Sequence, residues 1–401
     1  MKEQLAFMNY YMDLHVHLGR TTNNAPVKIT ASKNMTLEAV LLEASNNKGM
    51  DIIGIIDCLS PSVLSEIEQF IHEGRATELS EGGVLFDGKI TVILGAEIEL
   101  YDENCKGPIH VLCYFPTIAD MKSFSTWCSH YIKNIHLSTQ RIYISAKELQ
   151  TKVKKMGGWF IPAHVFTPFK SVYGKGVDTF MEEVFNLEHI DAIELGLSSD
   201  TSMGSKLSEL VPFPFLTNSD AHSVKMIARE HQVIQTEAPT FQEINKALQS
   251  SKGRSITKNV GLSPKLGKYF QTVCKYCHKT MNEASSCNHD ERSTVKGVSE
   301  RINELTLQQQ IISTASKAKS KFYRPPYLHQ APLEMIPGIG PKTIQSLIYK
   351  FGSEMVILHE VPSRALNEVL SPKFVKIVDL MRSGKLAIIP GGGGTKGRII
   401  E

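Results

Sequence analysis

Apolar runs typical of β-strands alternate with amphipathic stretches typical of helices through the first 260 residues, and this alternation constrains the fold most. The apolar runs fall at 11–17, 51–57, 90–100, 109–115, 158–163, 192–195, 213–218 and 232–236. Helical stretches lie between them at 37–48, 61–72, 118–131, 145–155 and 241–250. Two of these begin with capping boxes, Ser145-x-x-Glu148 and Thr240-x-x-Glu243. The alternation predicts a parallel sheet, and seven or eight such units favour a closed α/β barrel.

Polar residues collect where these predicted strands end. His15 and His17 come first, and because residues i and i+2 of a strand share a face, both imidazoles can reach one point. Later strand ends add Asp57, Cys58, Glu97, His110, His164, Asp220 and His222. Any one of them could be a core histidine or a surface carboxylate. Their recurrence at the carboxyl ends of strands indicates two or three divalent ions, such as zinc, manganese or magnesium, suited to phosphoester hydrolysis.

The order of these motifs resembles the polymerase and histidinol phosphatase (PHP) family over residues 10–260. That resemblance implies a distorted seven-stranded (βα) barrel with three metal ions. By motif, His15, His17, Glu97 and Asp220 would hold one ion, Glu97, His110 and His164 a second, and His222 would help to hold a third. The expected catalytic residues are Asp220, His222 and Arg20, and the Arg20 guanidinium could bind a phosphate bidentately.

The chain departs from the PHP pattern after the second strand. Ile56-Asp57-Cys58 stands where the family usually has Thr-Asp-His. A Cys58 thiolate could replace the missing imidazole, since thiolates are good zinc ligands. Alternatively, Asp57 ligates the ion directly, or the third ion is weakly held.

The formal net charge of +3 is divided unequally along the chain. Residues 1–260 carry −6 and residues 261–401 carry +9. The net negative charge of the first segment suits metal binding, and the net positive charge of the second suits a polyanion such as nucleic acid. A solvated surface would have the same composition. The chain contains no membrane-spanning apolar run, and Met1–Asn9 lacks a secretion signal. We therefore expect a cytoplasmic, nucleoid-associated protein.

The spacing of cysteines and histidines within residues 261–292 predicts a small zinc module. Cys274 and Cys277 form a Cys-x2-Cys pair, and Cys287 and His289 follow at a distance typical of structural zinc, with His278 as an alternative fourth ligand. Four other cysteines of the seven are scattered at 58, 105, 113 and 128, which argues against a disulfide framework. A closed four-ligand site would stabilise a segment too short to fold on its own core.

The last segment, residues 293–401, is predicted to be helical and to bind DNA. A long helix is expected over 293–316. Gly338-Ile339-Gly340 resembles the turn of a helix-hairpin-helix, whose backbone N–H groups reach a phosphate beside Lys342. Lys396 lies in the glycine-rich tail 390–398, which could contact the DNA backbone or be a flexible end.

Two loops of the barrel could also contact DNA. The loop 165–175 mixes aromatic and basic residues, which suits base stacking beside a phosphate backbone. The alternative is a lid loop whose aromatics pack on the barrel. Residues 196–202 could line a pocket or cap the following helix. The expected contacts are Phe166, Phe169, Lys170, Tyr173, Lys175, Ser198 and Ser199.

The succession of barrel, zinc module, helix-hairpin-helix and glycine-rich tail resembles the endonuclease Q family along nearly the full length. That resemblance implies a monomeric DNA-repair endonuclease acting on damaged double-stranded DNA. It would cut on the 5′ side of uracil, hypoxanthine, xanthine or an abasic site, leaving 3′-hydroxyl and 5′-phosphate ends. The alternatives are a PHP-type phosphatase for small molecules, an inactive DNA-binding scaffold and a 3′→5′ exonuclease. The basic second half argues against the first, and the nearly complete ligand set argues against the second.

Overall fold

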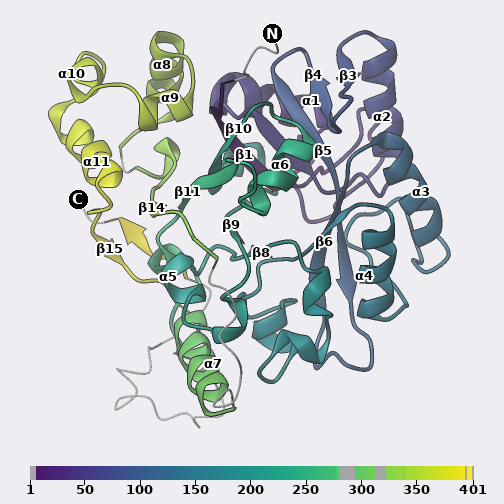
Figure 1. Cartoon of the computed structure of the whole chain (residues 1–401). Helices are drawn as coiled ribbons and strands as arrows, with labels where there is room; N and C mark the ends of the chain where they lie inside the picture. The colour runs from purple at the N-terminus through teal and green to yellow at the C-terminus, as the bar shows by residue number, and fades with distance from the viewer. Residues whose placement is uncertain are drawn as a thin grey trace.

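A ten-stranded mixed sheet forms the centre of the molecule in the computed structural model (Figure 1). The structure describes residues 6–277, 279, 294–312, 322–336, 338–392 and 395–399. The sheet runs β14-β11-β10-β1-β2-β5-β4-β3, and β6 and β7 continue it from β5. These strands are β1 (Met8–Val16), β2 (Ile52–Ile55), β3 (Ala76–Glu78), β4 (Val84–Phe86), β5 (Ile90–Leu100), β6 (Ile109–Phe115), β7 (Trp159–Pro162), β10 (His231–Thr236), β11 (Ser255–Gly261) and β14 (Tyr327–His329). The short strands β8 (Ile193–Glu194) and β9 (Phe215–Leu216) form a separate parallel pair.

The uniformly parallel sheet expected from the sequence is wrong. β1–β2 and β2–β5 pair in parallel, but β5–β6, β6–β7, β1–β10 and β10–β11 are antiparallel. The segment 101–108 between β5 and β6 contains no helix, so the chain reverses directly instead of crossing over the sheet. The mixed α/β architecture with a central sheet is as predicted, whereas the closed seven-stranded barrel stays a prediction.

Helices flank this sheet close to the predicted positions. They are α1 (Leu37–Leu42), α2 (Pro61–His72), α3 (Ile118–Cys128), α4 (Ala146–Lys155) and α6 (Phe241–Leu248), and α2, α3 and α4 lie along one side of the molecule (Figure 1). The side chains of Ser145 and Thr240 accept hydrogen bonds from the N–H groups of Glu148 and Glu243, which confirms both predicted helix starts. Every residue of β5 is buried, which places this strand in the middle of the core.

The second half of the chain packs against one end of this sheet. It contains α7 (Val298–Ile312), α8 (Pro341–Phe351), α9 (Glu354–His359), α10 (Ser363–Leu366) and α11 (Pro372–Arg382), with the short pairs β12 (Val273–Cys274)–β13 (Thr294–Val295) and β15 (Ile388–Ile389)–β16 (Arg398–Ile399). β14 pairs in parallel with β11, so this half extends the first-half sheet. The predicted division into 1–260, 261–292 and 293–401 stays a prediction. Among the described helices, none combines the length and the apolar character needed to cross a membrane.

A buried ion pair links the two halves. The Nζ atom of Lys48 lies 2.7 Å from a carboxylate oxygen of Glu354 on α9, and the two side chains are 6% and 4% exposed. The other oxygen of Glu354 accepts a hydrogen bond from the backbone N–H of Leu333 at 2.9 Å. Such a pair costs desolvation energy, but it leaves an uncompensated buried charge if one partner is removed.

We therefore expect Lys48→Met to lower the free energy of unfolding by about 3 kcal/mol, because Glu354 would stay buried without its cation. Denaturant unfolding followed by circular dichroism measures this. Lys350→Met is the matched control: Lys350 lies 2.6 Å from Glu368 in an exposed pair, and its loss should cost about 0.5 kcal/mol. Equal effects of the two substitutions would contradict the structural role of the buried pair.

Candidate metal centre

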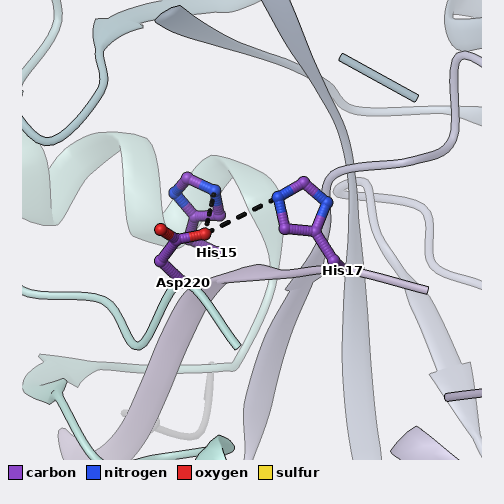
Figure 2. Close-up of side chains that lie close together, drawn as sticks. All are labelled: His15, His17 and Asp220. Carbon is purple, nitrogen blue, oxygen red and sulfur yellow. Dashed lines mark ion pairs between the residues drawn. The ribbon is translucent and has the colours of Figure 1, made fainter. Parts of the chain in front are cut away.

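Two histidines, His15 in β1 and His17 directly after it, lie in the interior and turn their Nε2 atoms toward one carboxylate. His15 and His17 are fully buried and share a face of the strand, as the i, i+2 spacing predicted. Their Nε2 atoms lie 3.4 Å and 3.6 Å from Oδ1 of Asp220, which follows β9 in the chain (Figure 2). Ligand atoms of the three residues all fall within 4.8 Å of one another, so this first ligand group can hold one ion.

A carboxylate behind each ring fixes this orientation. The Nδ1 atom of His15 lies 2.9 Å and 3.1 Å from the two oxygens of Glu194, and Nδ1 of His17 lies 3.0 Å from Oδ1 of Asp57. Because each carboxylate accepts the Nδ1 proton, the Nε2 lone pair is left for a metal. Sequence reasoning missed Glu194, because it stands in a two-residue strand whose segment reads as ordinary core.

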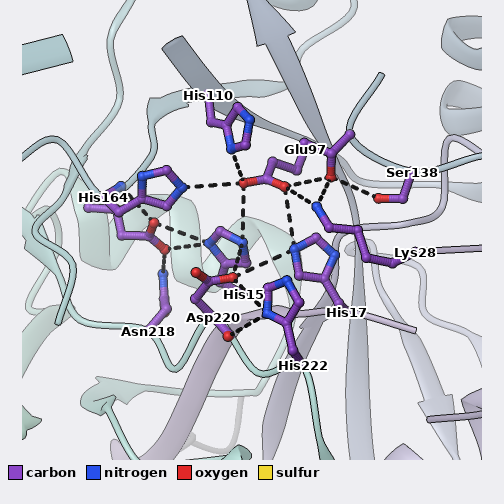
Figure 3. Close-up of polar contacts among 12 residues, drawn as sticks. His15, His17, Lys28, Glu97, His110, Ser138, His164, Asn218, Asp220 and His222 are labelled. Atoms are coloured by element: carbon purple, nitrogen blue, oxygen red, sulfur yellow. Dashed lines mark hydrogen bonds and ion pairs between the residues drawn. The ribbon is translucent and has the colours of Figure 1, made fainter. Parts of the chain in front are cut away.

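Glu97, His110 and His164 form a second ligand group next to the first. Glu97 lies on β5, His110 on β6, and His164 follows β7. Oε1 of Glu97 lies 2.8 Å from Nδ1 of His110 and 3.4 Å from Nε2 of His164 (Figure 3). All three residues are buried, and their ligand atoms lie within 4.8 Å of one another. The structure thus brings together two sets of predicted ligands.

Lys28, Ser138 and Thr139 were not predicted; the first and the third contact Glu97, and the Ser138 hydroxyl contacts Asp57 and Thr139. The Nζ atom of Lys28 lies 3.0 Å from Oε2 of Glu97, and the Thr139 hydroxyl donates to the same oxygen at 2.6 Å. Lys28 comes from the loop after β1, and the other two come from the segment between α3 and α4. Neither segment has a periodic pattern, so the sequence gives no signal for these residues.

All members of the two ligand groups except His15 line a cavity of about 430 Å³, together with His222, Lys28 and Lys170. The Glu99 carboxylate forms ion pairs with two cations near this cavity: its oxygens lie 3.0 Å from Nζ of Lys170 and 2.8 Å from Nη2 of Arg141. A hydrogen bond with His110, together with these cations, lowers the pKa of Glu99 to about 2, so the carboxylate is ionised at neutral pH. The cavity therefore combines buried anionic ligands with exposed cations.

The backbone is strained at one ligand of each group. The φ angle is 31° at His164 and 45° at Asp220, in the left-handed region that residues with a Cβ atom rarely adopt. Neighbouring hydrogen bonds hold these conformations: the N–H of His164 donates to Glu194 at 2.9 Å, and Arg229 donates to the carbonyl oxygen of Ser219 at 2.8 Å. Strain of this kind is typical of functional sites.

Carboxylates and imidazoles set each other's protonation in this cluster. Burial lowers the pKa of His15, but Glu194, Asp220 and Glu97 together raise it to about 10. Burial raises the pKa of Asp220, but His15 and His222 bring it below its ordinary value. A bound cation would take over the charge of these protons, so metal binding at this site releases protons.

The donor set fits divalent metal ions. The Nε2 atoms of His15 and His17 are buried and have no hydrogen-bond partner among the described residues. A buried polar atom left unpaired costs about 1–3 kcal/mol, and two of them converge here beside the Asp220 carboxylate. Imidazole nitrogens mixed with carboxylate oxygens suit zinc, manganese and related ions.

Asp57 is not a member of either ligand group. Its Oδ1 atom interacts with His17 and the Ser138 hydroxyl, and its Oδ2 atom accepts the backbone N–H of Leu18. These contacts orient the ring of His17. Direct ligation of a metal by Asp57 stays a prediction.

Cys58 is in neither ligand group. Its Sγ atom donates to the carbonyl oxygen of Ile55 at 3.1 Å, and the residue is fully buried. Burial raises the pKa of the thiol. Ligation of a third ion by a Cys58 thiolate stays a prediction. Of the residues predicted for a third ion, His222 remains in the cavity, with Nδ1 3.0 Å from the carbonyl oxygen of Asp220.

Arg20 is not among the residues that line the cavity, and its catalytic role stays a prediction. Its guanidinium donates a hydrogen bond to the side chain of Asn24, and its backbone forms a bridge with Pro26. The chain thus folds back on itself directly after β1, which keeps the Arg20 side chain in a local turn.

Four predicted DNA contacts belong to the interior. Phe166 and Tyr173 are buried and stack with ring centres 5.4 Å apart, and the Tyr173 hydroxyl donates to Glu209 at 2.6 Å. Ser198 and Ser199 are also buried, and the Ser199 hydroxyl donates to a backbone carbonyl at 2.9 Å. The packing alternative is correct for these residues, because the loop closes onto the core.

Phe169, Lys170 and Lys175 are exposed, as a DNA contact requires. Phe169 is 49% exposed and packs edge-on against Tyr269 at 5.5 Å, and Nζ of Lys175 lies 5.3 Å from its ring centre. Phe169 lines both the 430 Å³ cavity and a second cavity of about 400 Å³, which Lys175 and Arg301 also line.

The predicted DNA-binding turn precedes α8. Gly338 has a φ of 88°, and a Cβ atom there would lie 2.7 Å from the ring of Phe374, so glycine is required. Gly340 is the N-cap of α8, and Lys342 in the first turn is exposed, as is Lys396. A short 3-10 helix, Leu333–Met335, lies before this turn in the chain.

Two of the predicted zinc ligands, Cys274 and Cys277, lie within the described residues. Cys274 is buried at the end of β12, and the backbone N–H of Tyr276 donates to its sulfur at 3.4 Å. Cys277 is partly exposed. The other predicted ligands, Cys287 and His289, and the alternative His278 lie outside the described residues. The structural zinc site therefore stays a prediction.

The chain is similar to known proteins along nearly its whole length. It is 49% identical to an uncharacterized protein of Bacillus subtilis, YqxK, over 391 residues that cover 97% of this chain and 98% of that protein. It is 36% identical over 257 residues to MJ0043 of Methanocaldococcus jannaschii, covering 58% of this chain and 31% of that protein. No protein-family model matches the chain.

Two solved structures of endonuclease Q have the same fold. One is the lesion-specific endonuclease PfuEndoQ from Pyrococcus furiosus, with a TM-score of 0.82 and 29% identity, covering 98% of this chain and 95% of that chain. The other is an endonuclease Q complex with a 27-mer duplex substrate that has an abasic lesion at the active site. Its TM-score is 0.80 and its identity 29%, covering 98% of this chain and 96% of that chain.

We expect Glu194→Gln to weaken binding of manganese by about 10–100-fold, because His15 would lose the carboxylate that orients its ring. Titration against a chelator of known affinity measures the dissociation constant. Glu209→Gln is the matched control, since Glu209 is a buried carboxylate that bonds Tyr173 and backbone N–H groups instead of a metal ligand. Unchanged metal affinity in folded Glu194→Gln would contradict the role given to Glu194.

Proposed function

The chain belongs to the endonuclease Q family, and on that premise we propose that it is a metal-dependent endonuclease of DNA repair. The observation that carries the proposal is the pair of buried ligand groups, His15–His17–Asp220 and Glu97–His110–His164. Two neighbouring ions held there would supply the Lewis acidity that activates an attacking water and neutralises charge on the attacking and leaving oxygens of a phosphodiester. The PHP-type barrel that the resemblance implies belongs to the same proposal, with two ions in the centre.

The chain's own side chains would orient the reacting phosphate. Lys170 and Arg141 present positive charge beside the cavity, and Glu99 holds both in place. The Asp220 side chain is 32% exposed, so it can reach a water molecule in the cavity as well as the two histidines. Cleavage that leaves 3′-hydroxyl and 5′-phosphate ends requires this water to lie opposite the leaving 3′-oxygen.

The proposed substrate is double-stranded DNA with uracil, hypoxanthine, xanthine or an abasic site, cut on the 5′ side of the lesion. The second cavity, which shares Phe169 with the cavity at the metal ligands, supports this proposal. Its volume and its basic lining of Lys175, Lys296 and Arg301 suit an extruded nucleotide. Extrusion costs least for a mispaired, damaged or missing base, which would give selectivity.

The second half of the chain would hold the duplex through its backbone. The Gly338–Gly340 turn at the N-terminus of α8, with Lys342 beside it, can bind a phosphate without reading sequence. The zinc module and Lys396 would add contacts of the same kind. A monomeric state and association with the nucleoid complete the proposal.

We expect Asp220→Asn to slow cleavage of a uracil-containing duplex by about 10³-fold or more, because the first ligand group would lose its carboxylate. DNA affinity should change little. End-labelled duplexes with one uracil, one abasic site or no lesion, each with manganese or with chelator, measure cutting. Asp87→Asn is the matched control, since Asp87 also has a φ of 45° but lies outside the cavity lining.

A metal-dependent cut directly 5′ of the lesion, absent from the undamaged duplex, is the expected result for the wild type. Stepwise loss from the 3′ end without regard to the lesion would instead identify an exonuclease. Tight binding without cutting would identify a scaffold, and turnover of a small phosphomonoester alone would identify a phosphatase.

We expect Lys342→Ala to weaken binding of damaged and undamaged duplexes equally, and to reduce the slope of log affinity against log salt by about one unit. Fluorescence anisotropy over a range of salt concentrations measures both. Lys147→Ala, an exposed lysine on α4, is the control and should leave the slope unchanged. A loss confined to damaged DNA would contradict a sequence-independent phosphate contact.

A further inference from the structure

Lys28 is a nearly buried cation fixed beside the metal ligands. Its side chain is 12% exposed, its Nζ atom lies 3.0 Å from Oε2 of Glu97, and it also donates to the Thr139 hydroxyl (Figure 3). The backbone N–H of Lys28 donates to the carbonyl oxygen of Leu18 at 3.0 Å, which ties the loop to the end of β1. Lysine is seldom buried without a specific partner, so this position is built by the fold.

The surroundings of Lys28 lack the ligands for a third metal ion. Among the described residues, the side-chain clusters able to hold an ion are the two groups already given. Asp57 is occupied by His17, Ser138 and a backbone N–H, and the Cys58 thiol points to a backbone carbonyl. His222 alone remains, and one imidazole does not make a metal site, which takes at least three protein ligands.

We propose that the Lys28 ammonium takes the place of a third metal ion, so that the centre binds two ions and Lys28 contacts a non-bridging oxygen of the scissile phosphate. An ammonium group has three N–H donors. Two are directed to Glu97 and Thr139, and the third has no partner among the described residues. Lys28 also lines the 430 Å³ cavity, where that third donor can meet a phosphate oxygen. The phosphate contact rests on the proposed function, whereas the number of ions does not.

A fixed ammonium has two consequences for this centre. Its charge repels a third divalent cation from the space between Glu97 and His222. The ammonium is also part of the side chain and cannot leave the site as a bound ion can, so its contact with the phosphate does not depend on the metal concentration. Because the lysine ammonium is a compact point charge and the arginine guanidinium is a planar fork, Lys28→Arg would keep the charge but change the geometry.

The test counts manganese ions bound to the full-length protein. Equilibrium dialysis gives the stoichiometry, and electron paramagnetic resonance detects coupled manganese pairs. Manganese is chosen because thiolate sites such as the zinc module disfavour it. We expect two bound ions in the wild type and two in Lys28→Met, which removes the charge and keeps the length. Three ions in the wild type would overturn the proposal.

Cleavage kinetics test the phosphate contact separately. Lys28→Met should lower kcat on a uracil-containing duplex by about 10²-fold with little change in KM, because the contact strengthens in the transition state. Lys28→Arg should recover part of the rate, and Lys147→Met should behave as the wild type. A full rate in Lys28→Met would overturn the phosphate contact. If the wild type binds two ions but cuts no DNA, the proposed function fails and the ion count still stands.

Discussion

Two buried carboxylate–imidazole pairs, Glu194–His15 and Asp57–His17, are the interactions on which the rest of the site depends. Each carboxylate takes one ring nitrogen and leaves the other turned toward Asp220. Glu194 does more than orient one ring, since it also accepts hydrogen bonds from the Asn218 amide at 2.7 Å and from the backbone N–H of His164 at 2.9 Å. One side chain thus ties β1, the loop after β7 and the end of β9 into a single network. Such networks are rigid when every member is paired, and they specify ligand geometry without help from a bound ion.

The second half of the chain is attached to this framework by contacts of several kinds. β14 continues the central sheet, Lys48 pairs with Glu354, and Tyr11 of β1 stacks on His359 of α9 with ring centres 5.4 Å apart. Arg301 of α7 donates to the carbonyl oxygens of Tyr173 and Asp178, which fixes the end of the loop that contains Phe169. The basic second half therefore has a defined position relative to the cavity. A duplex bound by α8 and the glycine-rich tail would be held in a defined position relative to the cavity.

The parts of the site that repeat along the chain could be predicted, and the parts that depend on tertiary placement could not. His15, His17, His164 and Asp220 lie at or after the end of an apolar run, Glu97 lies inside one, and His110 lies at the start of one. The pattern of apolar runs therefore located them. Lys28 and Thr139 lie in loops without periodicity, and only the folded chain brings them to Glu97. The hydrogen bonds that the side chains of Asp57 and Cys58 make also could not be predicted from the sequence, because they depend on the folded chain. The prediction of a parallel sheet failed because an apolar run shows where a strand lies but not how the chain leaves it. A direct reversal, as between β5 and β6, and a crossover through a helix both begin after such a run.

Anomalous X-ray scattering from crystals grown with manganese and an abasic duplex would test the central claim most directly. The account predicts two manganese peaks, one among His15, His17 and Asp220 and one among Glu97, His110 and His164. The phosphate on the 5′ side of the lesion should lie against both ions. Peaks elsewhere, or a lesion bound far from these residues, would contradict the claim that the buried imidazoles of β1 and its neighbours form the centre that cuts DNA.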